Sequence, residues 1–466
     1  MKIDTQLKPA DLRPAIDRVF GIAADKVRLL ERAWDTSKGT PVFTVNGKYT
    51  TRGWTEWTQG FQYGCAILTF DATDDCELLE LGRQHTLKDM APHVTHIGVH
   101  DHGFNNLSTY GNLRRLMHEG RFEHNEWENH FYEMAIKASG AVQAARWTET
   151  IDARTGSPKD GGGFIYSFNG PQSLFIDTMR TIRILGAAHQ LGHALMGEQD
   201  TRHNLLGRSI QHALTTSKYI VFHGDSEHTY DVRGRTAHEG LFNRNDGRFR
   251  ARSTQQGYSP FSTWTRGLSW AVCGYPEQLE FLKTLKPADI KAASGLAKGD
   301  VIALYEQAAR DVCDHYIDDV STTDGITYWD DGAPNLHKLG DWRNAPADPY
   351  NDHEPVDATA SAIAAQGLIR FGQYLGKAKG KRYLQAGLSV ARTLFDEPYL
   401  STKKNHQGML LHSIYHWPNG WDNVPRGRKV ACDESSMWGD YHLLELANLI
   451  KRMANDAPYP VFFDKA

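Results

Sequence analysis

The sequence predicts an all-α protein, a single helical toroid whose functional groups lie on long loops. Apolar residues recur at three- and four-residue intervals in ten long segments, which is the periodicity of a helix with one buried face. Alternating runs of Val, Ile and Thr are few and short, so a large sheet is not expected. No low-complexity linker divides the 466 residues, and we therefore expect one domain over residues 1–466.

The ten helical segments are, in chain order, 12–34, 60–70, 106–118, 127–144, 173–196, 204–222, 301–316, 358–374, 383–395 and 436–453. Asp357 is a good N-cap ahead of the eighth segment. A further helix is expected to carry Trp264, Arg266 and Trp270 and to end before Pro276. The longest loops cover residues 148–172, 223–260, 322–356 and 415–433, and loops of this length are usually functional.

Composition argues against several classes of protein. The net charge is −4 and the charges are interspersed, so neither a nucleic acid nor an anionic membrane is an expected partner. No apolar run is long enough to span a membrane, and the first residues lack the apolar core of a signal peptide. The five cysteines are scattered along the chain and form no CxxC pair. The sequence therefore gives no sign of a disulfide framework or of a zinc site. We expect a soluble cytoplasmic protein, and a monomer and a homodimer both stay open.

The segment 256–270 is the most informative stretch of the chain. It begins with a polar turn at Gln256 and enters a helix in which Trp264 and Trp270 flank Arg266. A buried arginine is costly unless an anion meets it, and aromatic faces pack against sugar rings. Arginine also suits a bidentate contact with a carboxylate. The segment alone is equally consistent with a site for an acidic sugar and with tryptophans that fill the core.

Two aspartates are candidates for acid–base chemistry. Asp101 lies at the start of a predicted helix, where the helix dipole favours an ionised carboxylate. Asp177 follows three apolar residues, and apolar surroundings raise the pKa of a carboxyl group so that it holds a proton near neutral pH. Such a division of labour is common in enzymes that use two carboxylates. The alternative for each residue is an ordinary N-cap.

Histidines cluster at three places, but none of the clusters has the spacing of a known metal motif. His100 and His102 flank Asp101, His223 precedes a Gly-Asp pair, and His118 precedes a glutamate. No helical HExxH and no PCxxC pattern is present. We therefore interpret these histidines as hydrogen-bonding groups of a polar cleft, and we expect no metal and no cofactor.

Six segments, in order along the chain, resemble conserved patterns of glycoside hydrolase family 88, the unsaturated glucuronyl hydrolases. Residues 56–64 resemble W-T-x-G-F-x-x-G, residues 100–104 resemble H-D-[LI]-G-F, and residues 176–179 resemble the start of D-x-M-M-N-L. Residues 256–270 resemble Q-G-Y-S with S-T-W-A-R-G-Q-A-W, residues 357–365 resemble D-S-S-A-A-A-I-A-A, and residues 438–445 resemble W-G-D-Y-Y-F-L-E. The resemblance extends from about Trp54 to Leu449.

The resemblance implies an (α/α)6 barrel and a hydrolase that removes a terminal 4,5-unsaturated uronic acid from oligosaccharides. In that reaction Asp177 would protonate C4 of the double bond, and Asp177 or Asp101 would activate water toward C5, without a metal. The substrate-binding residues that the resemblance implies are Trp57 and Trp147 as stacking platforms, His100 beside Asp101, His238 and Gln256 near C5, and Trp264, Arg266 and Trp270 around the sugar.

Three departures from the family pattern concern the same site. Arg180 and Thr181 replace a Met-Asn pair, Pro260 and Phe261 replace a pair of aspartates, and the loop 419–429 is long and basic. That loop either contacts a sulfated or second acidic sugar or is a solvated lid, and both interpretations stay open.

Several other functions compete with this one. An unsaturated rhamnogalacturonyl hydrolase or an ordinary glucuronidase would use the same barrel. A polysaccharide lyase, a sugar epimerase and a non-catalytic carbohydrate-binding protein belong to other classes. The sequence shows no pair of histidines placed for an epimerase, and a binding protein would not need both Asp101 and Asp177.

Overall fold

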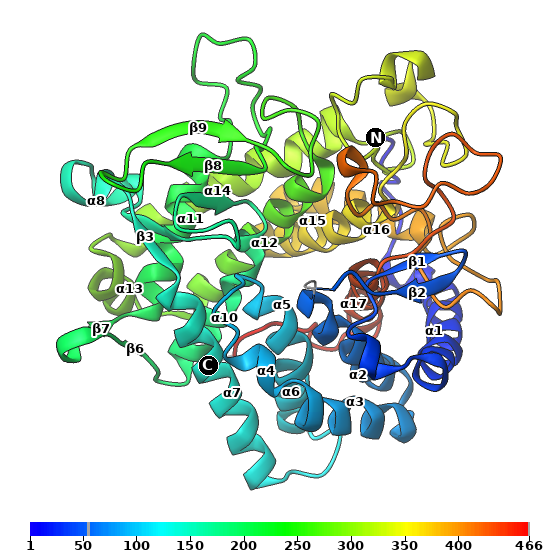
Figure 1. Cartoon of the computed structure of the whole chain (residues 1–466), viewed down its shortest axis with the longest axis horizontal. Helices are drawn as coiled ribbons and strands as arrows, with labels where there is room; N and C mark the ends of the chain where they lie inside the picture. The colour runs from blue at the N-terminus through cyan, green and yellow to red at the C-terminus, as the bar shows by residue number, and fades with distance from the viewer. Residues whose placement is uncertain (54–55, 465–466) are drawn as a thin grey trace.

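The computed structural model describes residues 1–53 and 56–464, so Trp54, where the resemblance begins, lies outside the described residues. The protein is mostly helical, as predicted (Figure 1). The long helices are α1 (Arg13–Ala33), α2 (Gln59–Thr73), α3 (Cys76–Asp89), α7 (Glu126–Ala145), α11 (Leu205–Tyr219), α12 (Thr265–Thr284), α14 (Lys298–His315), α15 (Ala358–Lys379), α16 (Lys381–Leu394) and α17 (Met437–Ala454). The shorter helices are α4 (Ala91–Val94), α5 (His102–Asn106), α6 (Asn112–His118), α8 (Asp152–Thr155), α9 (Thr178–Thr181), α10 (Arg183–Gln190) and α13 (Pro287–Ser294).

Most of the predicted helices are confirmed to within a few residues, but the segment 173–196 is not one helix. Its first residues form strand β5 (Ser173–Phe175), which pairs with β8 (Glu239–Phe242). Helix α9 begins only after Asp177, and α10 ends at Gln190. Partners more than 60 residues away along the chain therefore override the local periodicity. Helices α3 and α13 were not predicted.

Pro276 lies inside helix α12 and does not end it. A proline in a helix leaves the carbonyl four residues earlier without its backbone donor. Here that carbonyl belongs to Val272, and it lies so close to Gly367 of α15 that a Cβ at this glycine would collide with it. The two buried helices are packed backbone to backbone at this point, and the helix continues through the proline.

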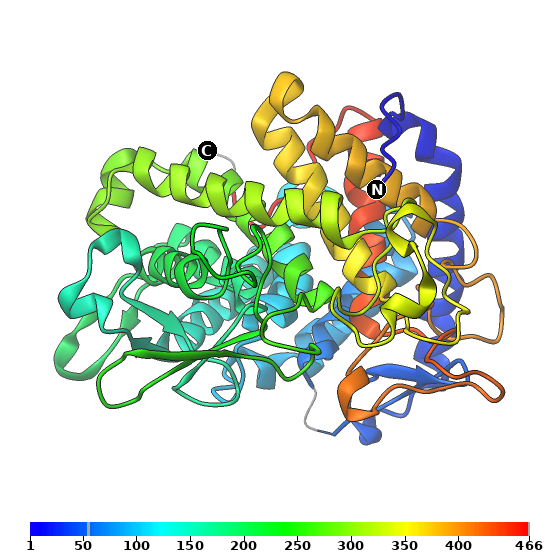
Figure 2. The same cartoon turned by 90° about the horizontal axis from the view of Figure 1, so that it is seen from above.

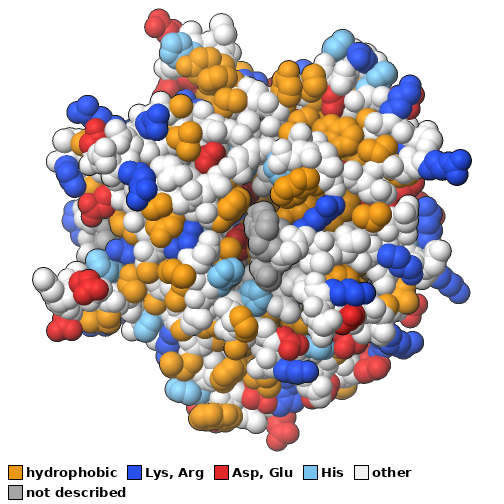
Figure 3. Space-filling model, viewed as in Figure 1, with side chains coloured by type: hydrophobic (Ala, Val, Ile, Leu, Met, Phe, Trp, Pro, Cys, Tyr) orange, Lys and Arg blue, Asp and Glu red, His pale blue; other side chains and the backbone are white. Residues whose placement is uncertain are grey.

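The strands form small sheets of two or three strands. They are β1 (Phe43–Val45) with β2 (Lys48–Thr50), β3 (Trp147–Glu149) with β4 (Gly163–Ile165), β6 (Leu195–Met196) with β7 (Arg202–His203), and the three-stranded β5-β8-β9, where β9 is Phe249–Ser253. Figure 2 shows β1–β2, β8–β9 and the loop 415–433 along the same side of the helical layer. On this side, Lys and Arg intermingle with Asp and Glu (Figure 3).

Candidate active site

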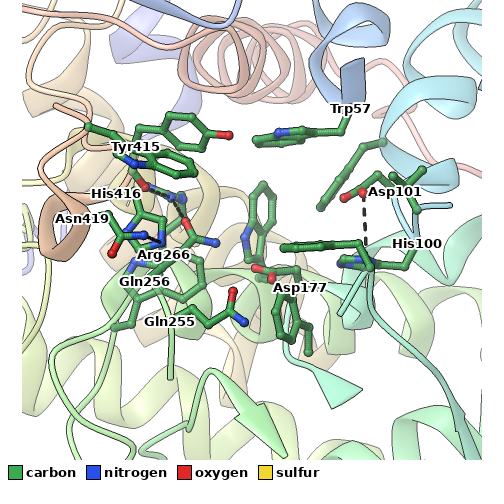
Figure 4. A pocket seen from close by; sticks show the side chains of 17 residues that line it. Trp57, His100, Asp101, Asp177, Gln255, Gln256, Arg266, Tyr415, His416 and Asn419 are labelled. Carbon is green, nitrogen blue, oxygen red and sulfur yellow. Dashed lines mark hydrogen bonds and ion pairs between the residues drawn. The ribbon is translucent and has the colours of Figure 1, made fainter. Parts of the chain in front are cut away.

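One cavity of about 170 Å³ lies where the helix N-termini meet the long loops (Figure 4). It collects residues from the whole length of the chain. Its lining consists of Trp57, Val99, His100, Asp101, Phe104, Phe168, Phe175, Asp177, Gln255, Gln256, Trp264, Arg266, Trp270, Tyr415, His416, Asn419 and Trp421. Eight of the ten predicted site residues are in this set. The remaining two, His238 and Trp147, lie elsewhere.

Asp101 and Asp177 occupy the N-cap positions of α5 and α9, yet neither side chain caps its helix. An ordinary N-cap carboxylate accepts a hydrogen bond from an amide of the first turn. Here both carboxylates face the cavity instead, and both residues are less than a tenth exposed. The N-cap interpretation is therefore wrong for both aspartates.

The proton affinity of Asp101 depends on its burial, on the charge of Asp177 and on the opposing charge of Arg146. Burial and Asp177 dominate and raise the pKa of Asp101 to about 7. Asp101 therefore holds its proton more tightly than an ordinary aspartate, contrary to what its place at a helix start predicts. A helix start favours a carboxylate only when the helix amides reach it, and those of α5 do not bond to this side chain.

We expect Asp101→Asn to make the protein more stable at alkaline pH. At pH 4, close to the ordinary aspartate pKa of 3.8, ionisation of the unfolded chain costs the folded state little, so the two proteins should be similar. As pH rises toward 7, the Asp101 carboxyl ionises in the unfolded wild type before it ionises in the folded one. The free energy of unfolding of the wild type therefore falls by about 1.4 kcal/mol per unit of pKa difference. Denaturant unfolding at pH 4 and pH 8 measures the difference. In an Asp177→Asn background the gain should shrink, and an equal gain at both pH values would contradict the assignment.

His100 lies beside Asp101, and its Nδ1 is 3.9 Å from the Asp101 Oδ2. Burial, and then the charge of Arg146, lower the pKa of His100 well below its usual range, so the ring is neutral at physiological pH. The carbonyl of His100 accepts hydrogen bonds from the Thr181 hydroxyl at 2.8 Å and from the Gln143 amide at 2.9 Å. Thr181, one of the departures from the family pattern, therefore fixes the backbone beside the carboxyl pair.

His238 does not line the cavity but contacts Asp177 from behind. Its Nδ1 accepts the backbone N–H groups of Gln255 at 3.0 Å and Gln256 at 3.3 Å. A neutral ring that accepts at Nδ1 carries its proton on Nε2. That Nε2 lies 3.6 Å from Asp177 Oδ2, so it faces the carboxylate without a hydrogen bond to it. His238 is buried between Phe175 and Trp264.

The Arg266 guanidinium makes its ion pair and its hydrogen bonds with other groups of the protein. This corrects its interpretation as a clamp for the substrate. Its Nη1 donates to Asp357 Oδ2 at 3.0 Å and to the carbonyl of Ile414. Its Nη2 donates to Gln256 Oε1 at 2.7 Å and to the carbonyl of Tyr415 at 2.8 Å. The anion that compensates the buried arginine is therefore Asp357, and the guanidinium organises the cavity wall.

The tryptophans fall into two groups. Trp57, Trp264 and Trp270 line the cavity, as predicted. Trp147 does not, because it lies in strand β3, opposite Ile165, with the Arg208 guanidinium 5.0 Å from its ring centre. Its position therefore gives no support to the predicted stacking on the sugar.

Nine cavity residues were not predicted as site residues: Val99, Phe104, Phe168, Phe175, Gln255, Tyr415, His416, Asn419 and Trp421. The last four belong to the loop 415–433, whose length was the only signal for them. Asp422 holds this loop by accepting the N–H groups of Tyr415 at 2.5 Å and His416 at 2.9 Å. Asn419 donates to His416 Nε2 at 3.1 Å.

Arg180, Phe261 and the basic residues of the loop 419–429 lie outside the cavity, although Asn419 and Trp421 of that loop line it. Arg180 is fully buried, and it pairs with Glu277 at 3.1 Å and Glu445 at 2.7 Å. Phe261 packs on Tyr230, with 4.7 Å between the ring centres. The basic residues of the loop 419–429 are Arg426, Arg428 and Lys429, and none of them lines the cavity.

Within the described residues, no group of three His, Cys, Asp or Glu side chains is placed to hold a metal ion. In the same part of the chain, no helix is long and apolar enough to cross a membrane.

Comparison with known proteins bears out the predicted resemblance. No family model matches the chain. An unsaturated chondroitin disaccharide hydrolase of Streptococcus pyogenes serotype M1 is 25% identical over 451 residues, which cover 94% of this chain and 91% of that protein. An unsaturated glucuronyl hydrolase of Formosa agariphila is 25% identical over 407 residues, which cover 86% and 80%.

Solved structures show the same fold. The unsaturated glucuronyl hydrolase of Bacillus sp. GL1 superposes with a TM-score of 0.67 at 20% identity and covers 97% of this chain and 99% of its own. The enzyme from Streptococcus agalactiae gives a TM-score of 0.68 at 20% identity, with 98% and 99% covered. These comparisons place the chain in the glycoside hydrolase class. Within that class, it resembles the unsaturated glucuronyl hydrolases over nearly its whole length.

Proposed function

We propose that this protein removes a terminal 4,5-unsaturated uronic acid from oligosaccharides by hydration of the double bond. The observation that carries the proposal is the pair of buried carboxyls, Asp101 and Asp177, which face one aromatic cavity and do not cap their helices. The names of the relatives agree with this function, since they are unsaturated glucuronyl and chondroitin disaccharide hydrolases.

The reaction needs a proton for C4 and a water molecule for C5. Protonation of the enol ether leaves positive charge on C5 and the ring oxygen, and attack of water on C5 gives a hemiketal. Ring opening then frees C1 as a hemiacetal, which releases the aglycone. The protein must supply a proton donor, an acceptor for the proton of water and negative charge near the cationic centre.

In this scheme Asp177 is the proton donor and Asp101 assists it. Asp177 lies between the two walls of the cavity, whereas Asp101 lies to one side, beside His100 (Figure 4). Burial, and then the charge of Asp177, raise the pKa of Asp101 to about 7, so the site retains a proton up to about neutral pH.

Three broader assignments belong to the same proposal. We propose that the helices form the (α/α)6 barrel of the family as one domain, which the single buried core from Leu7 to Phe463 supports. A reducing, cytoplasmic location is consistent with five free cysteines. The partners are unsaturated uronate oligosaccharides, and one structural neighbour was solved with the sulfated disaccharide dGlcA-GalNAc6S.

Reaction in heavy-oxygen water tests the proposal. Turnover of an unsaturated disaccharide should remove the absorbance of the double bond and place the label on C5 of the released keto acid. Mass spectrometry of the products locates the label. A saturated glucuronide is the control and should not be cleaved. Cleavage of this control with label on C1 would instead identify an ordinary glucuronidase, and loss of absorbance without release of the aglycone would also contradict the proposal.

A further inference from the structure

The inner end of the cavity and its mouth would hold different sugars of a bound disaccharide. Asp101, Asp177 and Trp270 are nearly inaccessible, whereas Phe168 is 40% exposed and Asn419 is exposed. A terminal uronic acid must enter first to bring its double bond to the carboxyls. The sugar that follows it therefore lies at the mouth, against Phe168, Asn419 and Trp421.

The cavity offers no available positive charge to that second sugar. Among the described residues that line it, Arg266 is the only lysine or arginine, and it is already paired with Asp357 and with two backbone carbonyls. Burial lowers the pKa of His416 to about 4, so that ring is neutral under working conditions. A second anionic group at the mouth would face Asp101 and Asp177 without a counterion.

The basic side chains that belong to the loop 419–429 or bond to it point to the same conclusion, because three of them bond to other groups of the protein and the fourth, Arg426, does not line the cavity. Lys429 pairs with Asp352 at 2.9 Å. Arg428 donates to the carbonyl of Tyr350 at 3.3 Å, with its guanidinium 4.7 Å from that ring centre. Arg52 donates to the carbonyl of Trp421 and so supports the wall from behind. Arg426 is exposed and does not line the cavity.

The wall at the mouth is instead aromatic and neutral. The ring centres of Trp421 and His416 lie 4.9 Å apart, and those of Phe168 and His100 lie 6.2 Å apart with nearly parallel planes. Aromatic faces and an amide suit the C–H faces and hydroxyls of an uncharged pyranose. We propose that Phe168, Asn419 and Trp421 form a second subsite that selects an uncharged, unsulfated sugar next to the uronic acid. This inference rests on the proposed function and specifies its substrate.

Paired substrates test the inference directly. Unsaturated disaccharides with and without a sulfate on the second sugar, including dGlcA-GalNAc6S and its unsulfated form, are compared by kcat/KM. We expect the unsulfated member of each pair to be preferred by at least ~10-fold, because an uncompensated like charge opposes binding. Equal rates, or a preference for the sulfated form, would overturn the inference and leave the proposed function intact. No turnover of any pair would refute both.

Two variants with matched controls locate the subsite. Asn419→Lys places a cation at the exposed mouth and should shift the ratio toward the sulfated substrate by roughly fivefold, whereas Asn419→Met should not. Phe168→Ala should lower kcat/KM by roughly three- to tenfold, mainly through KM. Phe261→Ala removes a similarly exposed phenylalanine, 45% exposed, outside the cavity and should have no effect. A loss of sulfated-substrate turnover in Arg426→Gln would show instead that the basic loop binds sulfate.

Discussion

Asp177→Asn is expected to lower kcat by about 10²–10⁴-fold, which is the usual contribution of a positioned proton donor. The substitution keeps the shape of the side chain but removes the transferable proton. Folding should be preserved, because the carboxylate makes no capping hydrogen bond that an amide would weaken. Steady-state kinetics with an unsaturated disaccharide, together with circular dichroism, measures the effect.

Asp75→Asn is the matched control for this substitution. Asp75 is also an aspartate at an N-cap, that of α3, and its side chain accepts the N–H of Glu77 at 3.2 Å. It does not line the cavity, so its replacement should leave kcat unchanged. If Asp177→Asn turned over substrate at the wild-type rate, the assignment of the proton donor would be wrong, and Asp101 would be the remaining candidate.

Arg266→Met is expected to destabilise the protein by about 3–5 kcal/mol, the usual effect of removing one partner of a buried ion pair. It leaves the Asp357 carboxylate buried without its cation. It also removes the donors that bind Gln256 and the carbonyls of Ile414 and Tyr415. Denaturant unfolding at neutral pH measures the loss.

The double variant Arg266→Met with Asp357→Asn separates the orphaned charge from the lost hydrogen bonds. Asparagine still caps helix α15, so the double variant removes the charge but keeps the cap. It should be more stable than Arg266→Met alone. An unchanged stability of Arg266→Met, combined with a large rise in KM, would restore the interpretation of Arg266 as a clamp for the uronate.

The parts of the site that the sequence predicted are those with a strong local signal. Asp101 and Asp177 were found because each stands at a helix start, and Trp264 and Trp270 because they share a helix with an arginine. The partner of Arg266 could not be predicted, because Asp357 lies 91 residues further along the chain. Phe168 and Trp421 are single aromatics in loops, and only the folded chain shows that they border one cavity. The helix predicted over 173–196 failed for the same reason, since β5 depends on β8.

Asp357 performs two tasks at once. One oxygen accepts the N–H groups of Thr359 at 3.1 Å and Ala360 at 3.4 Å at the start of α15, and the other bonds to Arg266. The first turn of a central helix and the wall of the cavity therefore share a single carboxylate. Neither can fray without disturbing the other, so this part of the site belongs to the cooperative unit of the core rather than to a locally unfolding loop. The subsite at the mouth lacks this tie to the core, so its side chains can change while the machinery for the double bond keeps its geometry.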